Sequence, residues 1–177
     1  VDGTTHIVAA DRDGSGAVRA PIDARSAELH WSPDGARVAC LTAGDTGTTR
    51  LRVLDAQTGS LTGLGEGLDI LGIAWAPDGS RVALRAREGT APPGAYVAWL
   101  DGRPTARGAV EADVSDLTWL PDGSGLLVTT ADDPPSTLLL RPGAEDSPRA
   151  VCRGVPLVAG APVLLDGRLR VTRPAGL

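Results

Sequence analysis

The sequence lacks lysine, asparagine, methionine and phenylalanine, and it has only two histidines, two cysteines and one tyrosine. All 17 cationic residues are therefore arginines, and the 22 acidic residues outnumber them, giving a formal net charge of −5. We expect no nucleic-acid-binding or anionic-membrane-binding surface, because both need clustered positive charge. The cysteines and histidines lack the close pairing of zinc ligands, and no cofactor is indicated.

Long hydrophobic runs are also absent. No stretch approaches the ~18–20 apolar residues of a membrane helix, and residues 1–20 contain no apolar signal-peptide core, so we expect no membrane insertion. The chain starts at Val1, which indicates a processed or excised piece and leaves the compartment open. A length of 177 residues favours one domain over residues 1–177.

One pentapeptide recurs along the chain. Trp31-Ser32-Pro33-Asp34-Gly35 returns with small changes 44 residues later and again after a further 44, at Trp75 and Trp119. A fourth step reaches Val163-Leu164-Leu165-Asp166-Gly167, which keeps the Asp-Gly turn. A period of about 40–45 residues with strand-rich units is typical of a β-propeller.

Each unit reads as four short strands. A strand ends at each tryptophan, and a Pro-Asp-Gly turn follows in which proline fixes φ and glycine tolerates positive φ. The other expected strands are Val38–Leu41, Leu51–Leu54 and Leu61–Leu64, then Val82–Leu84, Tyr96–Leu100 and Ala106–Val110, then Leu126–Thr129, Leu138–Leu140 and Ala150–Cys152. We therefore predict an all-β propeller of four-stranded antiparallel blades, with four 44-residue repeats.

The two ends of the chain read as complementary halves of one unit. Residues 3–7 align with Gly47 to Leu51, in the later half of a unit, whereas residues 157–171 supply only the first two strands. We expect one blade to be split between the N- and C-terminus, because pairing the halves removes free sheet edges. The blade closes either within one chain, as a four-bladed ring, or between two chains, as an eight-bladed homodimer. A fragment of a longer propeller is the third possibility.

The motif Trp31 to Gly35, followed by Ala36-Arg37-Val38-Ala39, resembles the WD-like repeat of the TolB propeller family. The turn Asp11 to Gly16 resembles that family's turn between the third and fourth strands. The segments Leu29 to Gly35 and Thr49 to Asp55 are also similar to the N-terminal propeller of bacterial prolyl oligopeptidase family serine peptidases. The second resemblance implies a propeller that gates access to a catalytic domain on another segment.

Catalysis within this chain is not expected. A serine hydrolase needs a nucleophile elbow such as Gly-x-Ser-x-Gly, followed by an acid and a histidine, and no such pentapeptide occurs. Asp11 and Asp13 begin like a calcium loop, but the twelfth position is Ile22 where a bidentate glutamate is required, so we interpret this segment as an acidic turn. Cys40 and Cys152 stand at different places in different repeats, and we interpret both as small buried hydrophobes.

Two groups of polar residues are candidates for ligand binding. On the innermost strands, Glu28 and His30 with Asp116 occupy positions off the tryptophan face and form a candidate set for a polar or cationic ligand. The alternative is that they meet a neighbouring blade or channel water. Asp69, Glu111 and Asp113 precede the innermost strands, at the end that also carries residues 91–94. We expect this acidic loop face to bind, since loops carry function.

The three tryptophans of the motif recur at equivalent places, so we predict that they are buried between blades rather than forming an aromatic cage. The sequence favours a non-enzymatic propeller that binds a protein or peptide through its acidic loop face. The alternative is an accessory gating propeller of a prolyl oligopeptidase-like enzyme.

Overall fold

The computed structural model describes residues 5–22, 27–43, 47–108, 110, 112–142, 149–153, 163–165 and 168–170. Within these ranges the regular structure is entirely β, so the all-β prediction is confirmed. No helix in the described part of the chain is long and apolar enough to cross a membrane.

Sixteen strands make up the described structure. Their bounds are β1 Thr5–Ala9, β2 Val18–Ile22, β3 Ala27–Trp31, β4 Arg37–Ala43, β5 Thr49–Asp55, β6 Leu61–Leu64, β7 Asp69–Trp75, β8 Arg81–Arg87, β9 Gly94–Trp99, β10 Ala106–Arg107, β11 Val114–Trp119, β12 Leu126–Thr130, β13 Ser136–Leu140, β14 Arg149–Arg153, β15 Val163–Leu165 and β16 Arg168–Arg170.

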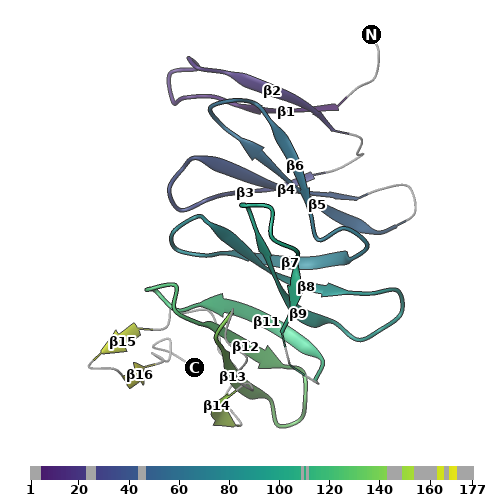
Figure 1. The fold of residues 1–177 in the computed structure, drawn as a ribbon, viewed down its shortest axis with the longest axis vertical. Helices are drawn as coiled ribbons and strands as arrows, with labels where there is room; N and C mark the ends of the chain where they lie inside the picture. The colour runs from purple at the N-terminus through teal and green to yellow at the C-terminus, as the bar shows by residue number, and fades with distance from the viewer. Residues whose placement is uncertain are drawn as a thin grey trace, which may run out of the picture.

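Three sheets have the predicted blade topology. Each contains four antiparallel strands hydrogen-bonded in chain order, namely β3 to β6, β7 to β10 and β11 to β14. These blades follow one another face to face in a row (Figure 1), which is propeller-like packing. Two further hairpins, β1–β2 and β15–β16, form separate two-stranded sheets at opposite ends of the row. The described residues thus show three complete blades rather than four.

The Pro-Asp-Gly turns are built from local hydrogen bonds. In the first, the Ser32 hydroxyl donates to Asp34 Oδ1, and the Ala36 amide donates to the same oxygen over 3.0 Å. Gly35 has φ +69°, a conformation that glycine adopts without steric cost. The Ser32 hydroxyl, followed by the Ala36 amide, lowers the pKa of Asp34. The sequence motif therefore specifies a turn that is stabilised by its own side chains.

The core lies between the blades. Strand alternation sends Leu51 and Val53 of β5 towards the next blade, where they pack with Val82 and Leu84 of β8. A second cluster, which includes Val97, Leu117 and Trp119, joins the next two blades. A third packs β1–β2 on the first complete blade through Ile7, Ala9, Ala20 and Ile22 against Val38, Cys40 and Leu54. Apolar burial between sheets is therefore the main force that holds the row together.

Two kinds of hydrogen bond recur at the interfaces between complete blades. The Trp75 indole Nε1 donates to the His30 carbonyl over 3.1 Å, and the Trp119 indole donates to the Ala74 carbonyl over 2.9 Å. In each case the acceptor is the residue before the preceding tryptophan. The Arg37 and Arg81 guanidiniums likewise donate to the next turn's glycine carbonyls, those of Gly79 and Gly123, over 3.4 and 2.6 Å. The repeat thus specifies contacts between units as well as within them.

The prediction that all three motif tryptophans are buried is wrong for Trp31. Trp119 is only 6% exposed and Trp75 is partly buried, whereas Trp31 is 52% exposed. The physical reason is that Trp31 faces the N-terminal hairpin, which supplies only two strands. That hairpin covers Val38, Cys40 and Leu54 and leaves the innermost strand β3 open.

Of the three closures that the sequence left open, a ring closed within one chain is not formed by the described strands. Figure 1 places β1–β2 and β15–β16 at opposite ends of the row, and neither hairpin pairs with the other. The row of packed blades that lies between them keeps the two halves of the split blade apart. Completion by a second copy stays a prediction.

Cys40 is a buried free thiol, and its burial raises its pKa. This agrees with the interpretation of Cys40 as a small core residue. The side chain of Cys152 lies outside the described residues.

Candidate functional site

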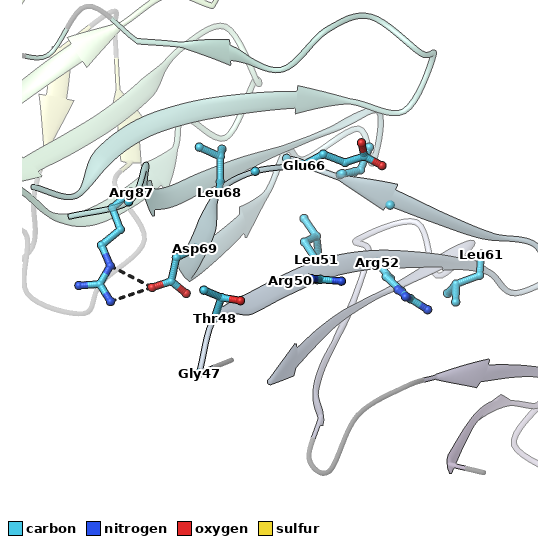
Figure 2. Close-up of a pocket in the computed structure, with 15 residues that line it drawn as sticks. Gly47, Thr48, Arg50, Leu51, Arg52, Leu61, Glu66, Leu68, Asp69 and Arg87 are labelled. Atoms are coloured by element: carbon cyan, nitrogen blue, oxygen red, sulfur yellow. Dashed lines mark hydrogen bonds and ion pairs between the residues drawn. The ribbon is translucent and has the colours of Figure 1, made fainter. Parts of the chain in front are cut away.

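A cleft of about 740 Å³ opens beside β5, β6 and the start of β7, on the side of the blades that carries the β8–β9 loop, which we call the loop side. Its walls come from the segments 47–52 and 61–69 and from Arg87 and Gly89 (Figure 2). This volume is within the range of small-molecule and peptide side-chain sites. The cleft is therefore the main candidate site in the described structure.

Asp69 forms part of the cleft wall and is fully engaged there. Its Oδ1 accepts a hydrogen bond from the Thr49 amide over 2.8 Å, and its Oδ2 accepts one from Arg87 Nε over 2.9 Å. Arg87 Nη2 forms an ion pair with the same Oδ2 over 2.8 Å. The Asp69 side chain is only 10% exposed. The carboxylate ties the start of β5 to β7 and β8, so in this structure Asp69 positions the cleft and is not an open contact for a ligand.

The Asp69–Arg87 pair depends on a β-bulge. In the hairpin of β7 and β8, Trp75 lies opposite Val82 and Gly72 opposite Arg85, but the register shifts between Ile70 and Gly72. Without this shift the same count would place Asp69 opposite Glu88, a like charge. Bulges re-aim side chains in this way. A matching shift occurs 44 residues later, between Val114 and Asp116 in β11.

The other charges of the cleft are Arg50, Arg52 and Glu66. Arg50 and Arg52 alternate along β5 and so share one face of the strand, and Figure 2 shows both side chains beside the cleft. Arg50 is exposed and Arg52 is half-buried, and neither is ion-paired with a residue in the described ranges. Three arginines and two carboxylates line the cleft, so it is locally positive in an acidic chain.

Glycines keep one side of the cleft open. Gly67 has φ +81°, and a Cβ there would meet nothing within 4 Å. Gly65, with φ +65°, lies where a Cβ would approach Leu84 Cδ1 to 3.0 Å. The β6–β7 connection therefore needs glycine at these two positions for its backbone conformation.

The predicted acidic loop face is described only in part. The Val114 amide donates to the Pro93 carbonyl over 2.9 Å, which places Asp113 beside the β8–β9 loop. Asp113 is exposed, as is Glu88 in that loop. Glu111 lies outside the described residues. Asp69 and Asp113 thus both lie on the loop side of the blades. Of these two, only Asp113 has an exposed carboxylate.

The predicted set on the innermost strands is brought together only in part. His30 Nε2 lies 2.9 Å from Glu28 Oε1, an ion pair when His30 is protonated, although the geometry is not that of a hydrogen bond. Asp116 lies two blades along the row, where its Oδ1 accepts the Leu117 amide over 2.8 Å. The blade β7–β10 separates these groups (Figure 1). They do not form one acid–histidine cluster.

Sequence reasoning missed Arg85, which lies beside Asp116 in a small hollow of about 140 Å³. The hollow also takes in Gly72 and Ser115, at or next to the two bulges. Arg85 Nη2 donates to the Leu71 carbonyl over 3.1 Å. The sequence shows a charged residue, Arg85, within the apolar run of β8. Its contact with the Leu71 carbonyl could not be predicted, because that contact lies at the bulge between Ile70 and Gly72.

The Asp11–Gly16 segment is a turn closed by its own serine. The Ser15 hydroxyl and amide donate to Asp13 Oδ1 over 2.7 and 2.9 Å, and the hydroxyl bond, followed by the amide bond, lowers the pKa of Asp13. Among the described residues, no group of three or more histidine, cysteine, aspartate or glutamate side chains is arranged to hold a metal ion.

The sequence matches no family model and no curated protein. Its fold is similar to TolB from Acinetobacter baumannii, with 21% identity over 82% of this chain and 37% of that one, at a TM-score of 0.53. The propeller domain of the trilobed protease from Pyrococcus furiosus is 19% identical over 72% of this chain and 42% of that one, at 0.55. Acylaminoacyl peptidase from Pyrococcus horikoshii is 20% identical over 84% and 28%, also at 0.55.

The chain spans less than half the length of these three proteins. At such identities the likeness is one of fold. Together with the face-to-face four-stranded sheets and the recurring tryptophan contacts, it shows that the described part of the chain has the fold of TolB and peptidase propellers.

Proposed function

We propose that this chain is a non-enzymatic binding module that binds a polypeptide segment on the loop side of its blades, which carries the β8–β9 loop. The observation that carries the proposal is the cleft beside β5, in which Arg50 and Arg52 have no carboxylate partner among the described residues. Arginine forks match carboxylates in a bidentate geometry. The partner segment therefore presents a carboxylate to the cleft.

The acidic loop face supplies the second contact. Asp113 is exposed beside the β8–β9 loop, and Glu111 is two residues before it in the sequence. Basic residues of the same partner segment pair with these acids, which steers association more than it adds affinity. The proposed ligand is thus a peptide of mixed charge.

A peptide selection on the immobilised chain tests the proposal. Random peptides displayed on phage are selected against the wild type, and the binding of the enriched peptides is measured with variants. We expect the double variant Arg50→Glu with Arg52→Glu to bind at least about 10-fold more weakly, since charge reversal replaces an attractive contact with a repulsive one. Asp113→Asn should slow association and reduce its dependence on salt.

The matched control reverses two arginines on the opposite side of the blades, Arg12→Glu with Arg141→Glu. Both are exposed and lie outside the strands, away from the cleft. This variant has the same net charge as the cleft variant and should keep the binding of the selected peptides. Equal losses in both double variants, or no enriched peptide that depends on Arg50 and Arg52, would remove the cleft as the binding site.

A gating propeller of a serine peptidase is the second candidate function. It is favoured by the likeness of fold to the trilobed protease and to acylaminoacyl peptidase. The coding sequence around this segment distinguishes the two. A Gly-x-Ser-x-Gly elbow and a later histidine downstream of Leu177 would support gating. A reading frame that ends without them would leave the binding module.

A further inference from the structure

The outermost strand of the first complete blade has an open edge. The strand β6 hydrogen-bonds to β5 on one side, and no described strand pairs with its other side. Thr62 and Gly63 in its middle are exposed, and Leu61 and Leu64 at its ends are half-buried. An edge strand of this kind presents a row of backbone N–H and C=O groups to which a further strand can pair.

Other strands at the borders of sheets carry features that discourage such pairing. The strand β10 is only two residues long and includes Arg107, and β14 has an arginine at each end. The strand β2, which also borders its sheet, contains Arg19 and Pro21. Short length, charge and proline are the means by which proteins protect sheet edges. The segment Leu61-Thr62-Gly63-Leu64 has neither charge nor proline and is twice as long as β10, so its edge is unprotected.

This unprotected edge borders the cleft of the proposed function. Leu61, Gly63 and Leu64 belong to the cleft wall, and residues 65–69 continue it without a break. Arg52 stands on the neighbouring strand β5 (Figure 2). The open edge and the unpaired arginines are therefore parts of one surface.

The register between β5 and β6 places Arg52 within reach of an added strand. Arg52 lies directly opposite Gly63, so both residues face the same side of the sheet. Neighbouring strands are about 4.8 Å apart, so a strand added outside β6 would lie about 10 Å from β5. An extended arginine side chain covers most of that distance, and a glutamate or aspartate side chain on the added strand covers the rest.

Gly63 leaves the path between these side chains open. It has no side chain of its own, and a Cβ there would meet only Glu66 Oε1 within 4 Å, at 3.8 Å. Glu66 is exposed and is not held by an ion pair with any residue in the described ranges, so its side chain can turn aside. The Arg52 guanidinium can therefore extend across Gly63 to the residue beyond it.

We propose that the partner peptide binds as a fifth strand on the β6 edge and places a carboxylate side chain across Gly63 from Arg52. This inference rests on the proposed function and specifies how its ligand is held. Backbone hydrogen bonds to β6 supply affinity, and the side chain beside Gly63 supplies specificity, as in other cases of strand addition. The ligand is thus an extended peptide with Asp or Glu at one position of the added strand.

Backbone N-methylation tests the strand addition. The probe is the synthetic form of the most enriched peptide from the selection on phage, with each N–H methylated in turn, and calorimetry with the wild type gives the dissociation constants. Alternate N–H groups of an added strand point towards β6 and away from it. Methylation should weaken binding at least about 10-fold at every second position, since it removes a hydrogen bond and adds a clash, and less than about 3-fold in between.

Gly63→Val tests the place of the carboxylate. A β-branched residue suits an exposed strand, so the variant should fold, but its side chain blocks the path of Arg52. Replacing the acidic residue of the peptide by its amide should weaken binding to the wild type at least about 10-fold, and to Gly63→Val less than about 2-fold. Thr62→Val is the control, because its side chain lies on the other face of β6. It should respond to the amide peptide as the wild type does.

A methylation profile without a period of two residues would overturn the added strand. So would an amide peptide whose loss of binding is the same for the wild type and for Gly63→Val. Either result leaves binding that depends on Arg50 and Arg52 intact. If no selected peptide depends on those arginines, the proposed function fails, and the added strand fails with it, so the two failures are distinguishable.

Discussion

At the scale of single residues, repeated sequence does not imply repeated environment. Trp31, Trp75 and Trp119 occupy the same motif position, yet the structure places them in exposed, partly buried and buried surroundings. The difference comes from what each tryptophan faces. Trp119 faces a complete blade with a carbonyl at 2.9 Å, whereas Trp31 faces a two-stranded hairpin.

The tryptophans therefore provide a matched pair of substitutions. Trp119→Ala should lower the free energy of unfolding by about 3–5 kcal/mol, because it leaves a cavity and an unpaired carbonyl. Trp31→Ala should cost less than about 1 kcal/mol in the single chain, as changes at half-exposed positions do. Urea denaturation measures both. Similar losses for the two variants would contradict the difference in burial.

The turn aspartates make stability depend on acid. Hydrogen bonds from the Ser80 amide and then from its hydroxyl lower the pKa of Asp78 below its usual value, and those from Ser124 do the same for Asp122. A carboxyl whose pKa is lower in the folded state stabilises the fold above its unfolded pKa of about 3.9. That contribution is lost as pH falls through the folded pKa.

Asp78→Asn tests this effect, because the amide oxygen can accept the same bonds without titrating. The wild type should be slightly more stable than the variant at pH 6, and the difference should shrink between about pH 4 and pH 2. Urea midpoints at constant ionic strength give the comparison. A difference that is independent of pH would show that the Asp78 charge contributes nothing to the turn.

At the scale of strands and turns, most of the fold was predictable. The Pro-Asp-Gly turns and the alternation around them predicted the strands at Val38, Leu51 and Leu126 to within about two residues, whereas β8 extends to Arg87, three residues beyond the expected Val82–Leu84. The turn chemistry is local, which is why sequence reports it. The last strand of the middle blade is shorter than predicted, since β10 covers only Ala106–Arg107.

The candidate site was less predictable than the strands. Asp69 was expected in a loop before the innermost strand, and the structure places it as the first residue of β7. Its partner Arg87 was not predicted, because their pairing depends on a bulge that the hairpin count does not show. The cleft depends on the path of the β6–β7 connection around Gly65 and Gly67. Alternation gives the face of a strand but not the path of a loop.

The Asp69 contacts should be important for stability. Asp69→Ala removes two hydrogen bonds and an ion pair from a nearly buried carboxylate and leaves Arg87 and the Thr49 amide without that acceptor. We expect a loss of about 2–3 kcal/mol, which is typical of hydrogen bonds to a charged group. Thermal or urea unfolding measures it, with Glu88→Gln in the adjacent exposed position as the control. A loss no larger than that of the control would contradict the anchoring role.

At the scale of the whole molecule, the row of blades separates two kinds of surface. The side of the blades that carries the β8–β9 loop presents the cleft, which Arg50 and Arg52 line, and the exposed Asp113. The face of β3 that points towards the N-terminal hairpin instead exposes the large apolar side chains of Leu29 and Trp31.

The central claim is that the loop side of the blades binds a peptide, and hydrogen–deuterium exchange with a selected peptide tests it most directly. Peptide binding should slow exchange in residues 47–52, 65–69 and 87–93. It should leave exchange unchanged in the Pro-Asp-Gly turns, which lie on the opposite side of the blades. The variant Arg50→Glu with Arg52→Glu should show no such protection at the same peptide concentration. Protection confined to the turns or to β1 and β3, with the cleft segments unchanged, would contradict the account.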